Sequence, residues 1–239
     1  MSSIQTKGIV LRENDAGETD KKLTLLTKTY GKITVSARGA RKPKSKFMAS
    51  AQLFTYSSFI LYDGGRFYSV AQADVIDNFF ELRTDYTRLC LAQYFMEMCD
   101  KTIPHGAPCD ELLHLLIISL SSLARNRRSP FLIARAFEIK FFQVSGVAPE
   151  VERCAKCGGP LSDPIRFGTE GALCGCYSQP ALIISAPALS AMRYILLADL
   201  PNIFKFCVGQ GVLDEMRGAS RLFFKHHFEV NIVSLSMLE

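Results

Sequence analysis

Between residues 4 and 75, hydrophobic positions come in short runs separated by polar turns, which is the pattern of a small all-β unit. Segment 30–39 is the clearest case, because its polar and apolar residues alternate from Lys32 to Ala37. This period of two is typical of a strand that buries one face. Asp63-Gly64-Gly65 predicts a hairpin turn between two further strands. Five short strands with turns between them fit a small barrel or a sandwich, and the OB-fold is a five-stranded barrel of this general kind.

Near residue 78 the hydrophobic spacing changes to that of amphipathic helices. Asp110 is expected to cap the second helix. Ser129 and Pro130 should begin the third helix, and Gly146 should end it. The pattern predicts five helices, within residues 78–102, 110–126, 129–146, 185–200 and 212–231.

These patterns predict an α+β protein of two domains. Residues 1–78 would form an OB-fold barrel that binds nucleic acid. Residues 79–239 would form an α-helical domain, with an inserted Cys-rich, zinc-finger-like segment at 150–180. The longest apolar run, 112–124, contains a His and three Ser and is too short to span a bilayer. Because the N-terminus also lacks the blocks of a signal peptide, we expect a cytoplasmic protein without a membrane partner.

The excess positive charge lies in the first third of the chain. The net charge is +5, and residues 1–80 carry 12 Lys and Arg against 7 Asp and Glu, whereas residues 81–239 carry 16 of each. Between Asp20 and Asp63 there are nine bases and no acid. This asymmetry indicates an anionic partner, and attraction to phosphates explains it better than a merely solvated surface.

The densest basic stretch is SARGARKPKSKF, residues 36–47. We expect a loop between two strands there, because Gly39 and Pro43 interrupt both strand and helix. A solvated turn without a partner is the alternative. The residues that we expect to contact nucleic acid are Lys32, Arg38, Arg41, Lys42, Lys44 and Lys46.

Aromatic residues crowd the segment that follows. Alternate rings should face the barrel core, and those that do not are able to stack on unpaired bases. For each ring on its own, a place in the core is the stronger expectation. The rings in question are Phe47, Phe54, Tyr56, Phe59, Tyr62, Phe67 and Tyr68.

Four of the eight cysteines fall within 154–176. Cys154 and Cys157 form C-x2-C, and after sixteen intervening residues Cys174 and Cys176 form C-x-C. Two Cys pairs at about this distance predict a zinc site, although C-x-C requires a bend that Gly175 permits. Four thiolates would leave no open position on the metal, so zinc would be structural. The alternatives are a site with three of the four ligands, or reduced thiols without metal.

Catalytic constellations are missing from the sequence. It contains no P-loop, no G-x-G-x-x-G and no G-x-S-x-G. His227-Phe228-Glu229 follows the cysteines, whereas a zinc deaminase has its H-x-E before them. We therefore predict that the protein is not an enzyme and has no small-molecule substrate.

Three segments, in this order, resemble bacterial RecO recombination mediators. KGIVLRENDAGETDKKLTLLTKTYGKITVSARGARKPKSKF resembles their N-terminal part. FEIKFFQVSGVAPEVERCAKCGG, with GALCGC, resembles their passage from helix to finger, although metal-binding relatives have C-x2-C where this chain has C-x-C. RLFFKHHFEVNIVSLSML resembles their C-terminal helix and tail. The resemblance covers essentially the whole chain.

The resemblance implies a mediator of DNA repair and homologous recombination. Such a protein binds single- and double-stranded DNA, anneals complementary strands, and with RecR helps to load RecA onto DNA coated by single-strand binding protein (SSB). It would act in the cytoplasm, at the nucleoid, and RecF is an alternative to RecR as its working partner. We expect the helical domain to bind the acidic, apolar C-terminal tail of SSB in a groove edged by Arg135 and Lys140.

Two other classes of function stay open on the sequence. One is a zinc-ribbon accessory protein of transcription or translation that uses its barrel on RNA. The other is an enzyme with the Cys cluster at its active site. Binding to SSB separates the first from a mediator, and a probe for an open metal position separates the second.

Overall fold

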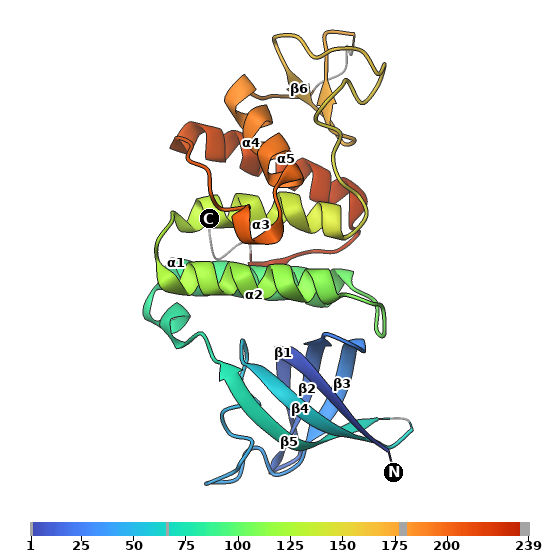
Figure 1. Cartoon of the computed structure of the whole chain (residues 1–239), viewed down its shortest axis with the longest axis vertical. Coiled ribbons are helices and arrows are strands. Elements are labelled where there is room, and N and C mark those ends of the chain that lie inside the picture. The colour runs from blue at the N-terminus through green and yellow to red at the C-terminus, as the bar shows by residue number, and fades with distance from the viewer. Residues whose placement is uncertain (1, 66, 177–180, 235–239) are drawn as a thin grey trace. The chain divides into compact units, whose positions relative to one another are not determined.

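The computed structural model describes residues 2–65, 67–176 and 181–234. They divide into two compact units, coloured by position in Figure 1. We call residues up to Arg125, together with the segment from Ile232, the barrel unit, and Asn126–Asn231 the helical unit. Among the described residues, no helix is both long and apolar enough to cross a membrane.

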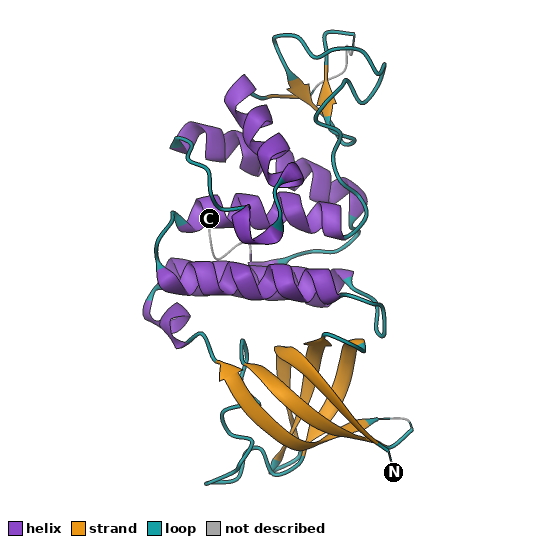
Figure 2. Ribbon diagram, viewed as in Figure 1, coloured by secondary structure: helices purple, strands orange, loops and turns teal. Residues whose placement is uncertain are grey.

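Five strands of the barrel unit close in the order β1-β2-β3-β5-β4, with β1 paired to both β2 and β4. The predicted OB-fold barrel is thereby confirmed (orange strands, Figure 2). The weakest join is between β3 and β5, a parallel pair in which only Val35 and Ser36 have partners. The strands are β1 Ser3–Ala16, β2 Asp20–Thr27, β3 Gly31–Ala37, β4 Tyr56–Asp63 and β5 Tyr68–Asp77.

The barrel core follows from the alternation in the sequence. Ile33, Val35 and Ala37 of β3 are buried, as their period of two predicts. The basic stretch after β3 is the expected loop, spanning residues 38–55 before β4 begins. Its apolar residues, including Phe47 and Ala51, pack into the same core. The loop is therefore fixed at its apolar positions, while its bases point outward.

Two helices complete the barrel unit, α1 (Tyr86–Thr102) and α2 (Asp110–Arg125). α1 begins eight residues later than predicted, after the short 3-10 helix η1 (Phe80–Thr84), because Asp85 caps it by accepting a hydrogen bond from the Arg88 N–H at 2.9 Å. Asp110 was expected to cap α2 but is its first helical residue, a difference of one position.

The helical unit contains α3 (Pro130–Val144), α4 (Ala186–Leu197) and α5 (Gln210–His227). The predicted start of α3 is confirmed in position, with Ser129 at the N-cap and Pro130 first in the helix, although the Ser129 side chain makes no capping hydrogen bond. Gly146 follows the helix with φ +81°, as expected of a C-terminal glycine. The core is aromatic, and the rings of Phe142 and Phe223 lie 4.8 Å apart. A finger with three two-residue strands lies between α3 and α4, formed by β6 (Arg166–Phe167), β7 (Ala172–Leu173) and β8 (Leu182–Ile183).

Candidate metal centre and nucleic-acid interface

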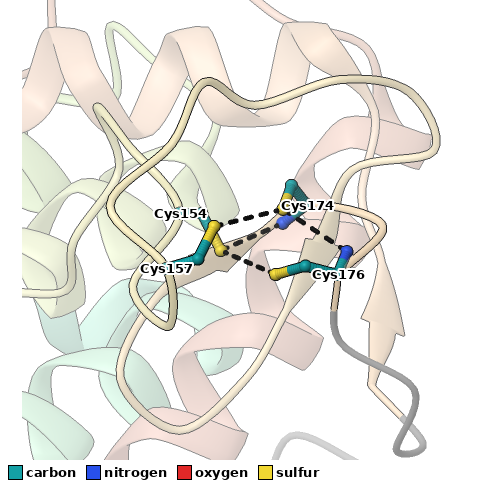
Figure 3. Close-up of side chains that lie close together, drawn as sticks. All are labelled: Cys154, Cys157, Cys174 and Cys176. Atoms are coloured by element: carbon teal, nitrogen blue, oxygen red, sulfur yellow. Dashed lines mark hydrogen bonds between the residues drawn. The ribbon is translucent and has the colours of Figure 1, made fainter.

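The four clustered cysteines come together in the finger (Figure 3). Their sulfur atoms all lie within 4.8 Å of one another. The Sγ atoms of Cys154 and Cys176 are 3.7 Å apart, and those of Cys157 and Cys174 are 3.6 Å apart. A tetrahedral zinc with bonds of about 2.3 Å separates its sulfur ligands by about 3.8 Å. The donor set therefore fits a tetrahedral zinc ion.

Two turns place these thiols. In the first, Gly158 has φ +71° and donates its N–H to the Cys154 carbonyl at 2.8 Å, so the chain bends back after C-x2-C. In the second, the C-x-C pair directly follows β7 and turns at Gly175. The Cys176 N–H lies 3.4 Å from the Cys174 sulfur. The bend that C-x-C requires is therefore present.

Backbone donors favour a thiolate at Cys154. The Cys174 N–H donates to the Cys154 sulfur at 3.4 Å. This hydrogen bond is the main reason why the pKa of Cys154 falls to about 6. The pKa of Cys176 is instead raised, because its thiol is hydrogen-bonded to Cys174 and Cys157. Since the thiolate is the form that binds metal, Cys154 is ready to bind at neutral pH.

The finger is attached to the helices of its own unit on two sides. Arg193 of α4 donates from Nε to the Val151 carbonyl at 2.8 Å and forms an ion pair with Glu152 at 3.5 Å. The Nε2 atom of His227, at the end of α5, lies 2.9 Å from the Thr169 carbonyl oxygen. With four thiolates a metal here would have no open position, so the arrangement suits structure rather than catalysis.

The basic loop gives the barrel unit its exposed positive charge. Arg38, Lys42 and Lys44 are exposed. Lys46 is also exposed and donates to the Ala71 carbonyl at 3.1 Å. Arg41 is paired with Asp15 at 3.2 Å, so its charge is partly neutralised. The loop thus presents five bases to solvent, and among the described residues only Arg41 of the five has an acidic partner within ion-pair distance.

Lys32 is not part of this exposed basic surface. Its side chain is buried, with Nζ 3.6 Å from the Asp100 carboxylate and hydrogen-bonded to the Asp100 carbonyl. The period of two placed Lys32 on the outer face of the strand, but at this position its side chain contacts Asp100 of α1. The expectation that Lys32 contacts phosphate is therefore corrected, because its side chain is buried and forms an ion pair with Asp100 inside the barrel unit.

Arg135 and Lys140 are buried in the helical unit. Arg135 forms an ion pair with Glu138 at 2.9 Å, one turn along α3. Lys140 donates to the carbonyls of Leu196 and Ala198, near the end of α4, at 3.0 and 2.7 Å. The expected groove edge requires exposed charges, and the structure places both bases in the interior. Helical spacing alone did not predict that these two bases are buried. Arg135 is compensated by Glu138 on the same helix, and Lys140 by backbone carbonyls near the end of α4.

The aromatic residues of the barrel differ in burial, and Tyr56 and Tyr68 are half-buried. Phe47, Phe54 and Phe59 are buried, as expected for core rings. Tyr62 and Phe67 are 48% and 60% exposed, at the two sides of the β4–β5 hairpin turn. The sequence did not show which of these rings are buried and which are exposed, because the register between β4 and β5 decides which side chains face outward.

Comparison with known proteins covers the whole chain. The family description "Recombination protein O N terminal" matches residues 1–79, and "Recombination protein O C terminal" matches residues 83–236. The DNA repair protein RecO of Acetivibrio thermocellus is 38% identical over 100% of this chain and 97% of its own length. Those of Alkaliphilus metalliredigens and Pelotomaculum thermopropionicum are 32% and 31% identical, over 98% and 100% of this chain and 98% and 94% of their own lengths. The chain therefore belongs to the RecO family of DNA repair proteins.

Proposed function

We propose that this protein is a non-catalytic mediator of DNA repair and homologous recombination. It binds single- and double-stranded DNA through the barrel, anneals complementary strands, and together with RecR helps to load RecA onto SSB-coated DNA. The observation that carries this proposal is the exposed basic loop between β3 and β4, on a barrel of the OB type. Membership of a DNA repair family supports the same conclusion.

Phosphate charge governs the binding that we propose. Arg38, Arg41, Lys42, Lys44 and Lys46 contact the DNA backbone. Backbone contacts carry no sequence information, so the affinity should be similar for different sequences. Each phosphate neutralised on a single strand should lower the affinity by about 0.7 log units per tenfold rise in salt.

The remaining parts have supporting roles in this proposal. Zinc is held by Cys154, Cys157, Cys174 and Cys176 and fixes the fold of the finger. Residues 1–78 act as the DNA-binding domain, and residues 79–239 bind protein partners, among them the C-terminal tail of SSB. Because Arg135 and Lys140 are buried, the acidic tail must meet other bases of that domain. The place of action is the cytoplasm, at the nucleoid.

The test is a salt series of binding isotherms with fluorescently labelled oligonucleotides. Single-stranded and duplex DNA of several sequences, and RNA of one matching sequence, are titrated with the protein. We expect similar affinities across DNA sequences and a steep, linear dependence of log affinity on log salt. Binding that is confined to RNA, or that does not respond to salt, would contradict the proposal.

A further inference from the structure

A groove of about 510 Å³ opens on the outer surface of the barrel, where β3 meets β5. Exposed Tyr62 and Phe67 line it together with half-buried Tyr68. Lys22 and Arg38 also line it, and none of the described residues that line it is acidic. Its volume falls within the range of small-ligand sites.

The register of the strands explains why the surface is hollow here. Lys22 of β2 is opposite Ser36 of β3, Ser36 is opposite Ser69 of β5, and Ser69 is opposite Tyr62 of β4. Residues opposite one another point to the same face of a sheet, so these four form one row on the outside of the barrel. Two small serines lie between a long base and a large ring. The two serines therefore form the floor of the groove at the short β3–β5 join, and Lys22 and Tyr62 form its two sides.

The lining of the groove suits an aromatic anion. Aromatic Tyr62, Phe67 and Tyr68 and the small polar Ser36 and Ser69 are all among its lining residues. Lys22 and Arg38 bring positive charge to it, and the basic loop begins at Arg38. A ring that carries phosphates on both sides, as a nucleotide in a strand does, matches both properties.

We propose that this groove binds one unpaired nucleobase of a single strand, stacked against Phe67 and Tyr62, with the flanking phosphates on Lys22 and Arg38. The proposal rests on the proposed function and goes further, because it makes the groove specific for single strands. Paired bases of a duplex are already stacked and cannot enter, whereas the basic loop serves both forms. The two surfaces should therefore separate in variants.

The absence of tryptophan from the chain makes a direct test available. Phe67→Trp introduces a single tryptophan into the groove, and Phe80→Trp places one at another exposed site of the same unit, 61% exposed and outside the groove. Each variant is titrated with oligo(dT), with duplex DNA and with polyphosphate. We expect oligo(dT) to quench the fluorescence of Phe67→Trp strongly, duplex and polyphosphate to leave it almost unchanged, and Phe80→Trp to respond to none of them. Absence of quenching at oligo(dT) concentrations that saturate binding, measured by anisotropy, would overturn the proposal.

Alanine variants give the energetic counterpart. Tyr62→Ala and Phe67→Ala should each weaken single-strand affinity by about 5- to 150-fold, the range for one stacked base. Duplex affinity should change less than about twofold, and Phe80→Ala should leave both unchanged, with thermal unfolding confirming that each variant is folded. Equal losses for strand and duplex would overturn the groove's specificity. Unchanged DNA affinity together with lost binding of a protein partner would assign the groove to that partner. If the wild-type protein bound neither form of DNA, the proposed function itself would fail.

Discussion

The carboxylate of Glu97, on α1, accepts two hydrogen bonds from Ser234, which is 137 positions further along the chain. The Ser234 N–H donates at 2.8 Å and its hydroxyl at 2.5 Å, and the Val233 N–H adds a third bond at 2.9 Å. Lys101 pairs with the same carboxylate at 2.7 Å. The barrel unit is thus completed by a segment from the C-terminal part of the chain.

This cluster predicts a dependence of stability on pH. Burial alone would raise the pKa of Glu97, but the bonds from Lys101 and Ser234 outweigh it and lower the pKa to about 2. Because the folded pKa lies below the ordinary value near 4.5, the stabilisation is present above about pH 4.5 and is lost as the pH falls toward 2. Glu97→Gln should lower the free energy of unfolding by about 2–3 kcal/mol at pH 7.

The measurement is urea unfolding of both proteins between pH 3 and 8. The difference between wild type and Glu97→Gln should shrink at the acid end, and the exposed Glu81→Gln should show no such difference. A gap of constant size across the whole pH range would contradict the assignment.

Lys32→Met should lower the stability of the fold and leave the affinity for DNA unchanged. The substitution leaves the Asp100 carboxylate without its buried partner, so we expect a loss of about 2 kcal/mol in unfolding free energy. DNA affinity should stay within about twofold of wild type, as measured by anisotropy at low salt. A large loss of DNA affinity in a fully stable variant would contradict this prediction and indicate that Lys32 contacts DNA.

Replacing Lys42, Lys44 and Lys46 by Ala should weaken DNA binding for all sequences. Three lost phosphate contacts should lower the slope of log affinity against log salt by about 2 for single strands. The matched control removes two exposed lysines of the helical unit, Lys205 and Lys225. Equal affinity of the loop variant and the wild type at low salt would reject the loop as a DNA contact.

Cys154→Ser should remove zinc and destabilise the finger. Elemental analysis of the purified wild type should give about one zinc per chain, and the variant should have far less. A lost structural metal should lower the midpoint of thermal unfolding by about 5–10 °C. Cys207→Ser, at an exposed cysteine outside the cluster, is the control. A metal-free wild type of unchanged stability would contradict the assignment.

Local patterns sufficed for much of the fold. The alternation in β3 predicted that Ile33, Val35 and Ala37 enter the barrel core, and the start of α3 was predictable because Pro130 favours the first helical position. The spacing of Cys154, Cys157, Cys174 and Cys176 was sufficient to group them as one candidate site, because the ligand positions are close in sequence.

Features that depend on distant pairing were not readable. Lys32 appears in the sequence as one base among nine, and only the packing of α1 places Asp100 beside it. The row from Lys22 to Tyr62 joins four strands, so the groove exists only once their register is set. The pairing of Glu97 with Ser234 likewise has no local signal.

We propose that this protein acts on DNA already covered by SSB. Two complementary oligonucleotides are each coated with the cognate SSB, mixed, and followed by fluorescence energy transfer with and without the protein. Our account predicts that the protein accelerates annealing of the coated strands and that the loop variant, with Lys42, Lys44 and Lys46 replaced by Ala, is slower than the wild type. Acceleration of naked strands alone, with coated strands annealing at the background rate, would contradict the mediator role.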